Sequence, residues 1–145
     1  MAIFTSFDIS ASGMTAQRLR SDIISQNLAN VNSTSSQDGG AYRRKTVVFA
    51  EKNATAFSDI LLSTAGTVGT GVKVTRVIED YETAMNMVYD TAHPYADENG
   101  YVTYPNVNVV TEMTNLIDAS RAYEANVTAF NASKTMALKG LEIGK

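Results

Sequence analysis

The chain has 145 residues but no cysteine, only two prolines and a single histidine, His93. Without cysteine it can form neither a disulfide nor a zinc–thiolate site, and it has no thiol nucleophile. Charged residues make up only 19% of the sequence and the net charge is −3. It therefore lacks the basic excess with which proteins bind nucleic acid or acidic membrane surfaces. These absences argue against several classes of enzyme and against nucleic-acid binding.

The N-terminus lacks the marks of a secretory signal. The stretch MAIFTSFDISASGM has no Lys or Arg ahead of its apolar residues and no uninterrupted apolar run. No part of the chain approaches the roughly 18 apolar residues of a membrane-spanning helix. We therefore expect no cleavable signal peptide and no direct insertion into a membrane, so that any export would use another route.

The single histidine lies in the segment TAHPYADENG, near Asp90, Asp97 and Glu98. One interpretation is a metal site or an acid/base pair, and a hydrolase built on these residues would need tight binding of a divalent ion. The spacing matches neither a zinc motif nor an EF-hand loop. A turn of solvated polar residues is the favoured interpretation. We expect no catalytic, cofactor-binding or metal-binding residue, no cofactor and no enzymatic activity.

The clearest pattern lies near the C-terminus. From Val109 to Leu141, apolar residues recur at steps of three and four, which predicts a long helix with coiled-coil-like packing. The segment from Asn106 to Asn108, just after Pro105, suits the start of this helix. The predicted stripe comprises Val109, Met113, Leu116, Ser120, Tyr123, Val127, Phe130, Lys134, Ala137 and Leu141.

A second helix is predicted over residues 1 to about 32. Its stripe comprises Ile9, Ala16, Leu19 and Ile23, and the same register continues to Gln26 and Asn30. Because both ends of the chain carry such stripes, we expect the two terminal helices to pair. An isolated two-helix hairpin of this size is marginally stable, because ordering its backbone costs about as much free energy as burying its apolar stripes provides. The remaining apolar flanks favour an assembly protein whose ends order on docking.

The composition and residue pattern in the middle of the chain predict a small β-rich module. The turn signal at Asn99–Gly100 suits a hairpin, and STSSQDGG reads as a loop. The predicted strands are Lys45–Phe49, Val72–Glu79, Met85–Asp90 and Tyr101–Tyr104. The expected fold is thus mainly α with a small β-rich insertion. Residues 1–32 and 106–145 form paired terminal helices, and 33–105 form a linker and β-rich module with a mobile loop at about 51–71.

A short basic run, Tyr42-Arg43-Arg44-Lys45, leads into the first predicted strand. It could hold an acidic partner. Basic residues beside a strand are more often a solvated edge that discourages pairing with other chains. The sequence favours the second interpretation and leaves the first open.

The segment ASGMTAQRLRSDIISQNLANVNS resembles the N-terminal signature of bacterial flagellar rod, hook and hook-associated proteins, in which a small-residue helix leads into an Asn-Leu/Ile-Ala-Asn motif. Further similarity to the proximal rod proteins of this family covers nearly the whole chain. It is carried by GGAYRRKTVVF, GVKVTRVIED, VYDTAHPYADENGYVTYPNVNVVTEMTNLIDASRAYEANV and KTMALKGLEIGK.

The resemblance implies a structural subunit of the flagellar basal-body rod, which crosses the periplasm and transmits torque. It implies export through the flagellar type III apparatus, and assembly with copies of itself and other rod proteins. In the family, the paired terminal helices line the core of a tubular helical assembly. A competing hypothesis is a soluble coiled-coil adaptor or type III secreted effector that binds one partner through its C-terminal helix.

The asparagine cluster of SQNLANVNS is interpreted in this light. Asn30 on the extended stripe would fix the register between helices. Asn27, on a neighbouring face, would reach an adjacent subunit, and Asn32 would adopt the left-handed backbone that ends the helix. An ordinary solvated cap is the alternative. The candidate assembly interface comprises Leu19, Ile23, Asn27, Leu28, Asn30, Asn32, Val109, Met113, Leu116, Tyr123, Val127, Phe130 and Leu141.

Overall fold

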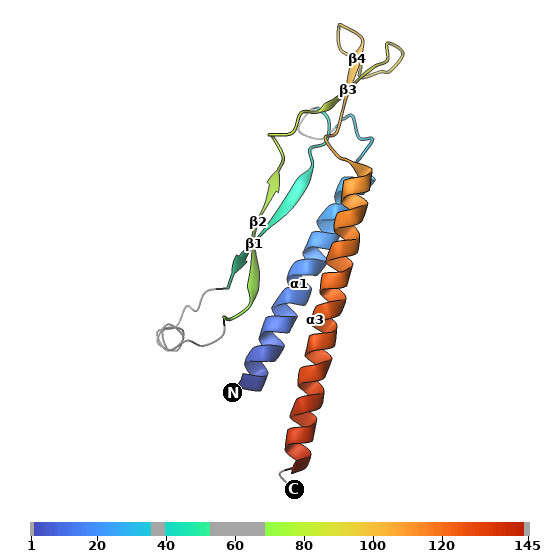
Figure 1. Ribbon diagram of the computed structural model, residues 1–145. Helices are drawn as coiled ribbons and strands as arrows, with labels where there is room; N and C mark the ends of the chain where they lie inside the picture. The colour runs from blue at the N-terminus through green and yellow to red at the C-terminus, as the bar shows by residue number, and fades with distance from the viewer. Residues whose placement is uncertain (1, 36–39, 53–68, 144–145) are drawn as a thin grey trace.

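The computed structural model describes residues 2–35, 40–52 and 69–143 (Figure 1). Two long helices at the ends of the chain flank two small β-hairpins, so the expected fold class is confirmed. Most of the loop predicted at about 51–71 lies outside the described residues. In chain order the elements are α1 (Ala2–Ala29), β1 (Lys45–Glu51), β2 (Val72–Glu79), β3 (Asn86–Tyr89), β4 (Tyr101–Tyr104) and α3 (Val109–Ile143).

The two helices lie side by side and run antiparallel (Figure 1). Near the chain termini the Phe7 and Phe130 rings are 4.9 Å apart between centroids. At the opposite end Asn27 Nδ2 donates to Glu112 Oε2 over 2.9 Å. The residue numbers of these facing pairs add up to 137 and 139, so one register holds along the helices. Since α1 begins at Ala2, the last turns of α3 extend beyond it (Figure 1).

The β1–β2 hairpin lies along α1 (Figure 1). At one end the Val72 N–H donates to Ser12 Oγ over 3.0 Å, and at the other the Lys45 backbone meets Asn27. The seven residues of β1 span about 23 Å, and the fifteen residue steps from Ser12 to Asn27 on α1 span about the same distance, so the hairpin and the helix match in length. Gly71 makes the close approach possible, since it has φ of +112° and an added Cβ would lie 2.3 Å from Ser12 Oγ.

The four strands form two separate antiparallel pairs. Lys45 pairs with Glu79 in the first, which has an irregularity between Val48 and Phe49. The second pairs Asn86 with Tyr104. The predicted second strand and the predicted returning strand after the Asn-Gly turn are confirmed residue for residue. The β3–β4 hairpin lies at the end of the helix pair away from the chain termini (Figure 1).

The helix boundaries differ slightly from the prediction. The N-terminal helix ends at Ala29 rather than near residue 32. The C-terminal helix begins at Val109, where Asn108 Oδ1 accepts hydrogen bonds from the N–H groups of Val110 and Thr111. An asparagine in this position satisfies backbone donors that have no partner inside the helix, so the predicted N-cap region is confirmed.

The buried face of α3 lies about one residue away from the predicted stripe. Glu112 and Ala119 are fully buried, whereas Met113 and Ser120 are exposed. Between the helices the close positions are small or polar, such as Gly13 against Asn126. The prediction followed the largest apolar residues, but several of those face outward. The predicted register was therefore wrong at Met113 and Ser120, whereas Phe130, also on the predicted stripe, does face α1 through Phe7.

Few apolar side chains are buried. The chain exposes 10190 Å², whereas a compact protein of 15.6 kDa exposes about 7,200 Å². Neither helix, over its described residues, is apolar enough along its length to cross a bilayer. The buried apolar residues among those described are Ala16, Ile24, Val102, Val107 and Ala119, and exposed large apolar residues are far more numerous.

Candidate functional site

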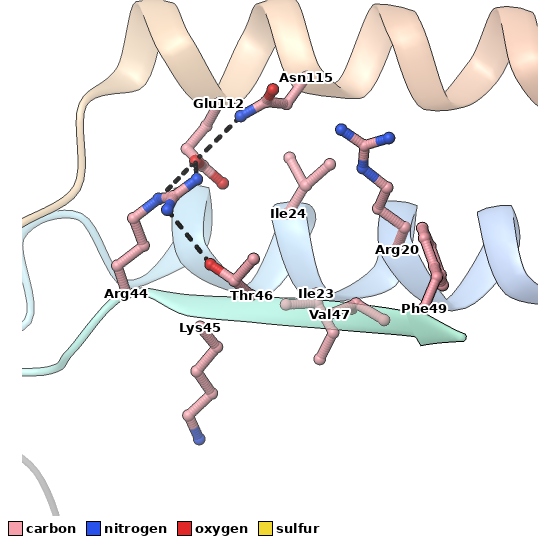
Figure 2. A pocket seen from close by; sticks show the side chains of 10 residues that line it. All are labelled: Arg20, Ile23, Ile24, Arg44, Lys45, Thr46, Val47, Phe49, Glu112 and Asn115. Carbon is pink, nitrogen blue, oxygen red and sulfur yellow. Dashed lines mark hydrogen bonds and ion pairs between the residues drawn. The ribbon is translucent and has the colours of Figure 1, made fainter. Parts of the chain in front are cut away.

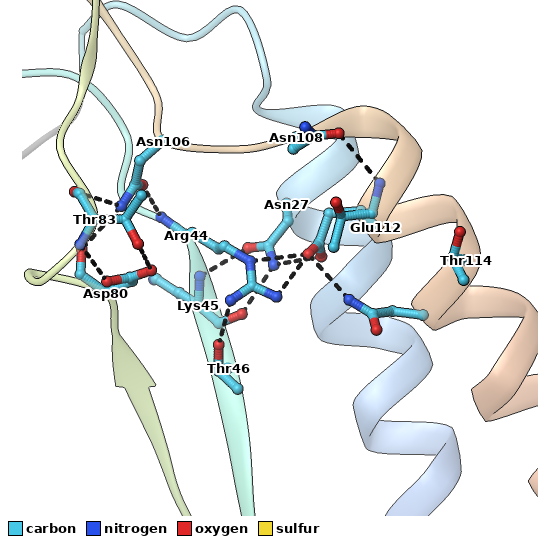
Figure 3. A network of polar contacts seen from close by, with 12 residues as sticks. Asn27, Arg44, Lys45, Thr46, Asp80, Thr83, Asn106, Asn108, Glu112 and Thr114 are labelled. Atoms are coloured by element: carbon cyan, nitrogen blue, oxygen red, sulfur yellow. Dashed lines mark hydrogen bonds and ion pairs between the residues drawn. The ribbon is translucent and has the colours of Figure 1, made fainter.

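A buried amide lies where α1, the start of β1 and the first turn of α3 meet (Figure 3). Asn27 on α1 is fully buried, and its side chain uses all four of its hydrogen-bonding positions. Its Nδ2 donates to Lys45 O over 2.8 Å and to Glu112 Oε2 over 2.9 Å. Its Oδ1 accepts from Lys45 N and from the Tyr42 hydroxyl, each over 2.9 Å. The amide thus pairs with the backbone of β1 much as another strand would.

Glu112, in the first turn of α3, is the charged member of this network. Its side chain is fully buried, and Arg44 Nη2 lies 2.8 Å from Glu112 Oε1. Arg44 Nε also donates to that oxygen over 2.9 Å, and Arg44 Nη1 donates to Thr46 Oγ1 over 3.2 Å. A buried carboxylate is strongly destabilising if its partner is removed. The ion pair therefore couples the position of α3 to the chain just before β1.

Asn106 extends the network toward the second hairpin. Its Oδ1 accepts from Arg44 N over 2.9 Å, and its Nδ2 donates to Asp80 O and Thr83 O. Asp80 in turn holds its own turn closed through hydrogen bonds from Glu82 N and from both the backbone and hydroxyl of Thr83. The hydrogen bonds from Thr83, with help from Glu82 and from Arg44, lower the pKa of Asp80.

Tyr42 links the network to the surface. Partial burial raises the pKa of Tyr42 above its usual 10.0, and the carboxylates of Glu79 and Glu112 raise this pKa further. Both effects favour the neutral hydroxyl, which is the form that donates to Asn27.

The basic run before β1 makes specific contacts within the chain. Arg44 pairs with buried Glu112, and the Arg43 guanidinium lies 4.4 Å from the centre of the Tyr81 ring. Lys45 Nζ lies 3.7 Å from Glu79 Oε1. The favoured interpretation of this run as a solvated strand edge was therefore wrong.

Beside the network, α1, β1 and α3 enclose a groove of about 320 Å³ (Figure 2). Ile23, Ile24 and Val47 provide its apolar wall, and the Arg44–Glu112 pair closes one end. Arg20 also lines it and makes no hydrogen bond or ion pair with any described residue. The groove is therefore lined by both apolar and charged side chains, and among these described residues there is no set of groups arranged for catalysis.

The asparagine cluster is arranged differently from the prediction. The buried amide is Asn27, which turns toward Lys45 and Glu112 rather than toward a neighbouring subunit, so its predicted placement was wrong. Asn30 is half-buried at the end of α1, where its Nδ2 donates to Gln26 O and its Oδ1 accepts from Ser33 Oγ. It caps the helix and does not lie on the buried face. No described residue other than glycine has a positive φ, so the left-handed backbone expected at Asn32 was wrong as well.

The other candidate interface residues fall into two groups. Half-buried residues are Leu19, Ile23, Leu28, Leu116, Val127 and Phe130. Exposed residues are Val109, Met113, Tyr123 and Leu141. Their role between subunits stays a prediction, and the exposed group is the part that remains available to a neighbour.

His93 belongs to the turn between β3 and β4. Its Nδ1 accepts a hydrogen bond from Tyr95 N over 3.2 Å, and its ring packs near those of Tyr95 and Tyr104. Within the described residues no three His, Asp or Glu side chains gather in a way that could hold a metal ion.

Sequence reasoning did not identify Tyr42, Arg44, Asn106 and Glu112 as partners in one site. The only local signal was Glu112 itself, an acidic residue in the first turn of a helix, where it is common for reasons of the helix dipole. Its partner Arg44 lies 68 positions earlier in the chain, and nothing local in the sequence links the two.

Two family models match the chain: Flagella basal body rod protein over residues 7–35, and Flagellar basal body rod FlgEFG protein C-terminal over residues 98–143. The curated relatives are flagellar basal-body rod proteins FlgC. The Bacillus subtilis protein is 46% identical over the full length of both chains. The Salmonella typhimurium protein is 42% identical over the full length of both, and the Borreliella burgdorferi protein is 42% identical over 99% of this chain and 98% of its own. The chain belongs to the FlgC family of flagellar basal-body rod proteins.

Proposed function

We propose that this structural rod protein assembles helically with copies of itself and with other rod proteins, through the outer faces of its terminal helices. In that assembly it forms part of a shaft that spans the periplasm and transmits torque. It carries no catalytic activity. Export proceeds through the flagellar type III apparatus.

The observation that carries this proposal is the apolar outer surface of α3. Leu141, on the part of α3 that extends beyond α1, is 72% exposed, and Met136, level with the first turn of α1, is 65% exposed. Val110, Met113 and Ile117 are exposed near its other end. Groups of large exposed apolar side chains on one helix are typical of a protein interaction site. It also fits a subunit that completes its apolar burial only against neighbours.

The proposal is tested by replacing the apolar end of α3 with serine at Met136, Leu138 and Leu141 together. These side chains are exposed, so the free energy of unfolding of the free protein should change by no more than about 0.5 kcal/mol per site. Incorporation into basal bodies, measured in cells that lack the natural copy, should be lost. A matched control replaces three exposed threonines of the same helix, Thr114, Thr128 and Thr135, with alanine. Normal incorporation of the serine variant would contradict the proposal.

A further inference from the structure

The β3–β4 hairpin has two unlike faces, of which the second is open. The first carries Val102, which is fully buried, and its cross-strand partner Val88, which is 49% exposed. On the other face Tyr89 pairs directly with Tyr101, and their rings meet edge to face with centroids 5.3 Å apart. Met87 lies two residues before Tyr89, so it shares this face. Met87 is 61% exposed and Tyr89 is 65% exposed, and no other described element covers them.

The turn beneath this face is held rigidly. Asp97 Oδ1 accepts the N–H groups of Asn99 and Tyr101, and the backbone of Asp90 bonds to that of Gly100. Gly100 has φ of +79°, and an added Cβ would lie 3.0 Å from Tyr89 Cε2. Rigid, exposed aromatic side chains lose little conformational entropy on binding, which is why they anchor interfaces.

The charge around the open face is of one sign. Residues 85–104, which contain this hairpin, include no Lys or Arg, and their acidic residues are Asp90, Asp97 and Glu98. Glu98 is exposed and makes no hydrogen bond or ion pair with any described residue. A partner for this surface should therefore offer apolar area together with basic side chains.

The β1–β2 hairpin of the same chain has this complementary character. The side chains of Lys73 and Arg76 on β2 are exposed and make no hydrogen bond or ion pair with described residues. Ile78, two residues after Arg76 on the same face of the strand, is also exposed, at 39%. The two hairpins lie at different levels along the molecule, and their described strands make no contact (Figure 1). Within one molecule the two surfaces therefore do not meet.

We propose that the open face of the β3–β4 hairpin (Met87, Tyr89 and Tyr101, with Glu98 at its edge) docks on the β1–β2 hairpin of a second copy, against Lys73 and Arg76. Each copy then offers two different, complementary surfaces. Contacts of this head-to-tail kind form a helical array when the rotation between copies does not close a ring. The inference rests on the proposed function, since it needs copies to lie side by side in the rod.

A charge-reversal set in cells that lack the natural copy tests the identity of the partner. Glu98→Lys alone and Arg76→Glu alone should each reduce the amount of this chain in purified basal bodies, because like charges across an interface repel. The double variant should restore it, because its two surfaces are again opposite in charge. Glu124→Lys is the matched control and should have no effect, because Glu124 is exposed on α3 and its side chain makes no hydrogen bond or ion pair with described residues. Circular dichroism of each purified free variant checks that the fold is kept.

A second measurement uses the absence of natural cysteine. Glu98→Cys combined with Arg76→Cys should give disulfide-linked dimers and longer ladders of this chain in oxidised basal bodies, whereas Glu124→Cys combined with Arg76→Cys should give none. Any of three results would overturn the inference. The Glu98→Lys variant could enter basal bodies in the normal amount, the double reversal could fail to restore assembly, or the disulfide ladder could be absent. Variants that still enter basal bodies in those cases would leave the proposed role of the helices intact.

Discussion

The two ends of the helix pair are built differently. Toward the hairpins, Asn27, Glu112 and Asn106 are buried and fully engaged in hydrogen bonds, and Ile24 and Ala119 are buried beside them. Toward the termini, no described side chain of α3 beyond Ala119 is buried. One end is therefore held by its own polar network, and the other presents its apolar surface outward. One pair of helices can therefore combine an end that is held in place by buried hydrogen bonds with an end whose apolar side chains remain exposed.

The largest effect should come from removing the buried charge. Glu112→Ala leaves the Arg44 guanidinium and the Asn27 amide without their partner, and we expect the free energy of unfolding to fall by about 3 kcal/mol. The loss should lie at the lower end of the range for buried pairs because the Arg44 side chain is 26% exposed. Urea unfolding of the free protein measures it. Glu124→Ala, at an exposed site on the same helix, should change stability by less than about 0.5 kcal/mol, and equal losses in both variants would contradict the comparison.

The next effect separates the two asparagines. Asn27→Ala removes four hydrogen bonds and leaves buried backbone groups of Lys45 unpaired, so it should cost about 2 kcal/mol. Asn30→Ala removes only capping interactions at the end of α1 and should cost no more than about 1 kcal/mol. The same urea measurement compares them. If Asn30→Ala proved the more costly, the assignment of the buried amide would be wrong.

A smaller effect is expected near the termini. Phe130→Ala removes the ring contact with Phe7, but both side chains are only half-buried. The free protein should lose about 1 kcal/mol, less than Asn27→Ala loses. Basal-body incorporation of Phe130→Ala should nevertheless fall if, as we propose, this end packs against neighbouring subunits in the assembly. A larger stability loss than that of Asn27→Ala would reverse the comparison.

The smallest effect concerns Tyr42. Tyr42→Phe removes one hydrogen bond to Asn27 and should cost about 0.7 kcal/mol at neutral pH. Because the folded pKa of Tyr42 is raised above 10.0, its contribution is fully present below pH 10 and is lost as the pH rises through the folded pKa. The stability difference between the natural protein and Tyr42→Phe should therefore shrink above pH 10. A difference that stays constant to higher pH would show that the hydroxyl is not held in its neutral form.

Local patterns predicted the outline of the fold. The recurrence of apolar residues every three and four positions predicted both helices, and the turn signal at Asn99–Gly100 predicted the second hairpin. These features depend on residues close together in the sequence. The family resemblance, carried by motifs such as SQNLANVNS and DENGYVTYPNVNVV, led to the family that the comparisons show.

The polar network escaped prediction for a physical reason. Its members are brought together by tertiary contacts such as Asn27–Glu112, which are 85 positions apart. The contact face of α3 is built from small and polar residues, so a search for apolar stripes selected the outward-facing neighbours instead. The sequence interpretation places the partners of Asn27 in an adjacent subunit, whereas they lie in the same chain.

Hydrogen exchange of backbone amides, compared between the free protein and isolated rods, tests the difference between the two ends most directly. In the free protein the amides of residues 16–29 and 109–119 should be protected, whereas those of residues 4–10 and 127–142 should exchange rapidly and become protected only in rods. Equal and strong protection along both helices of the free protein would contradict the account.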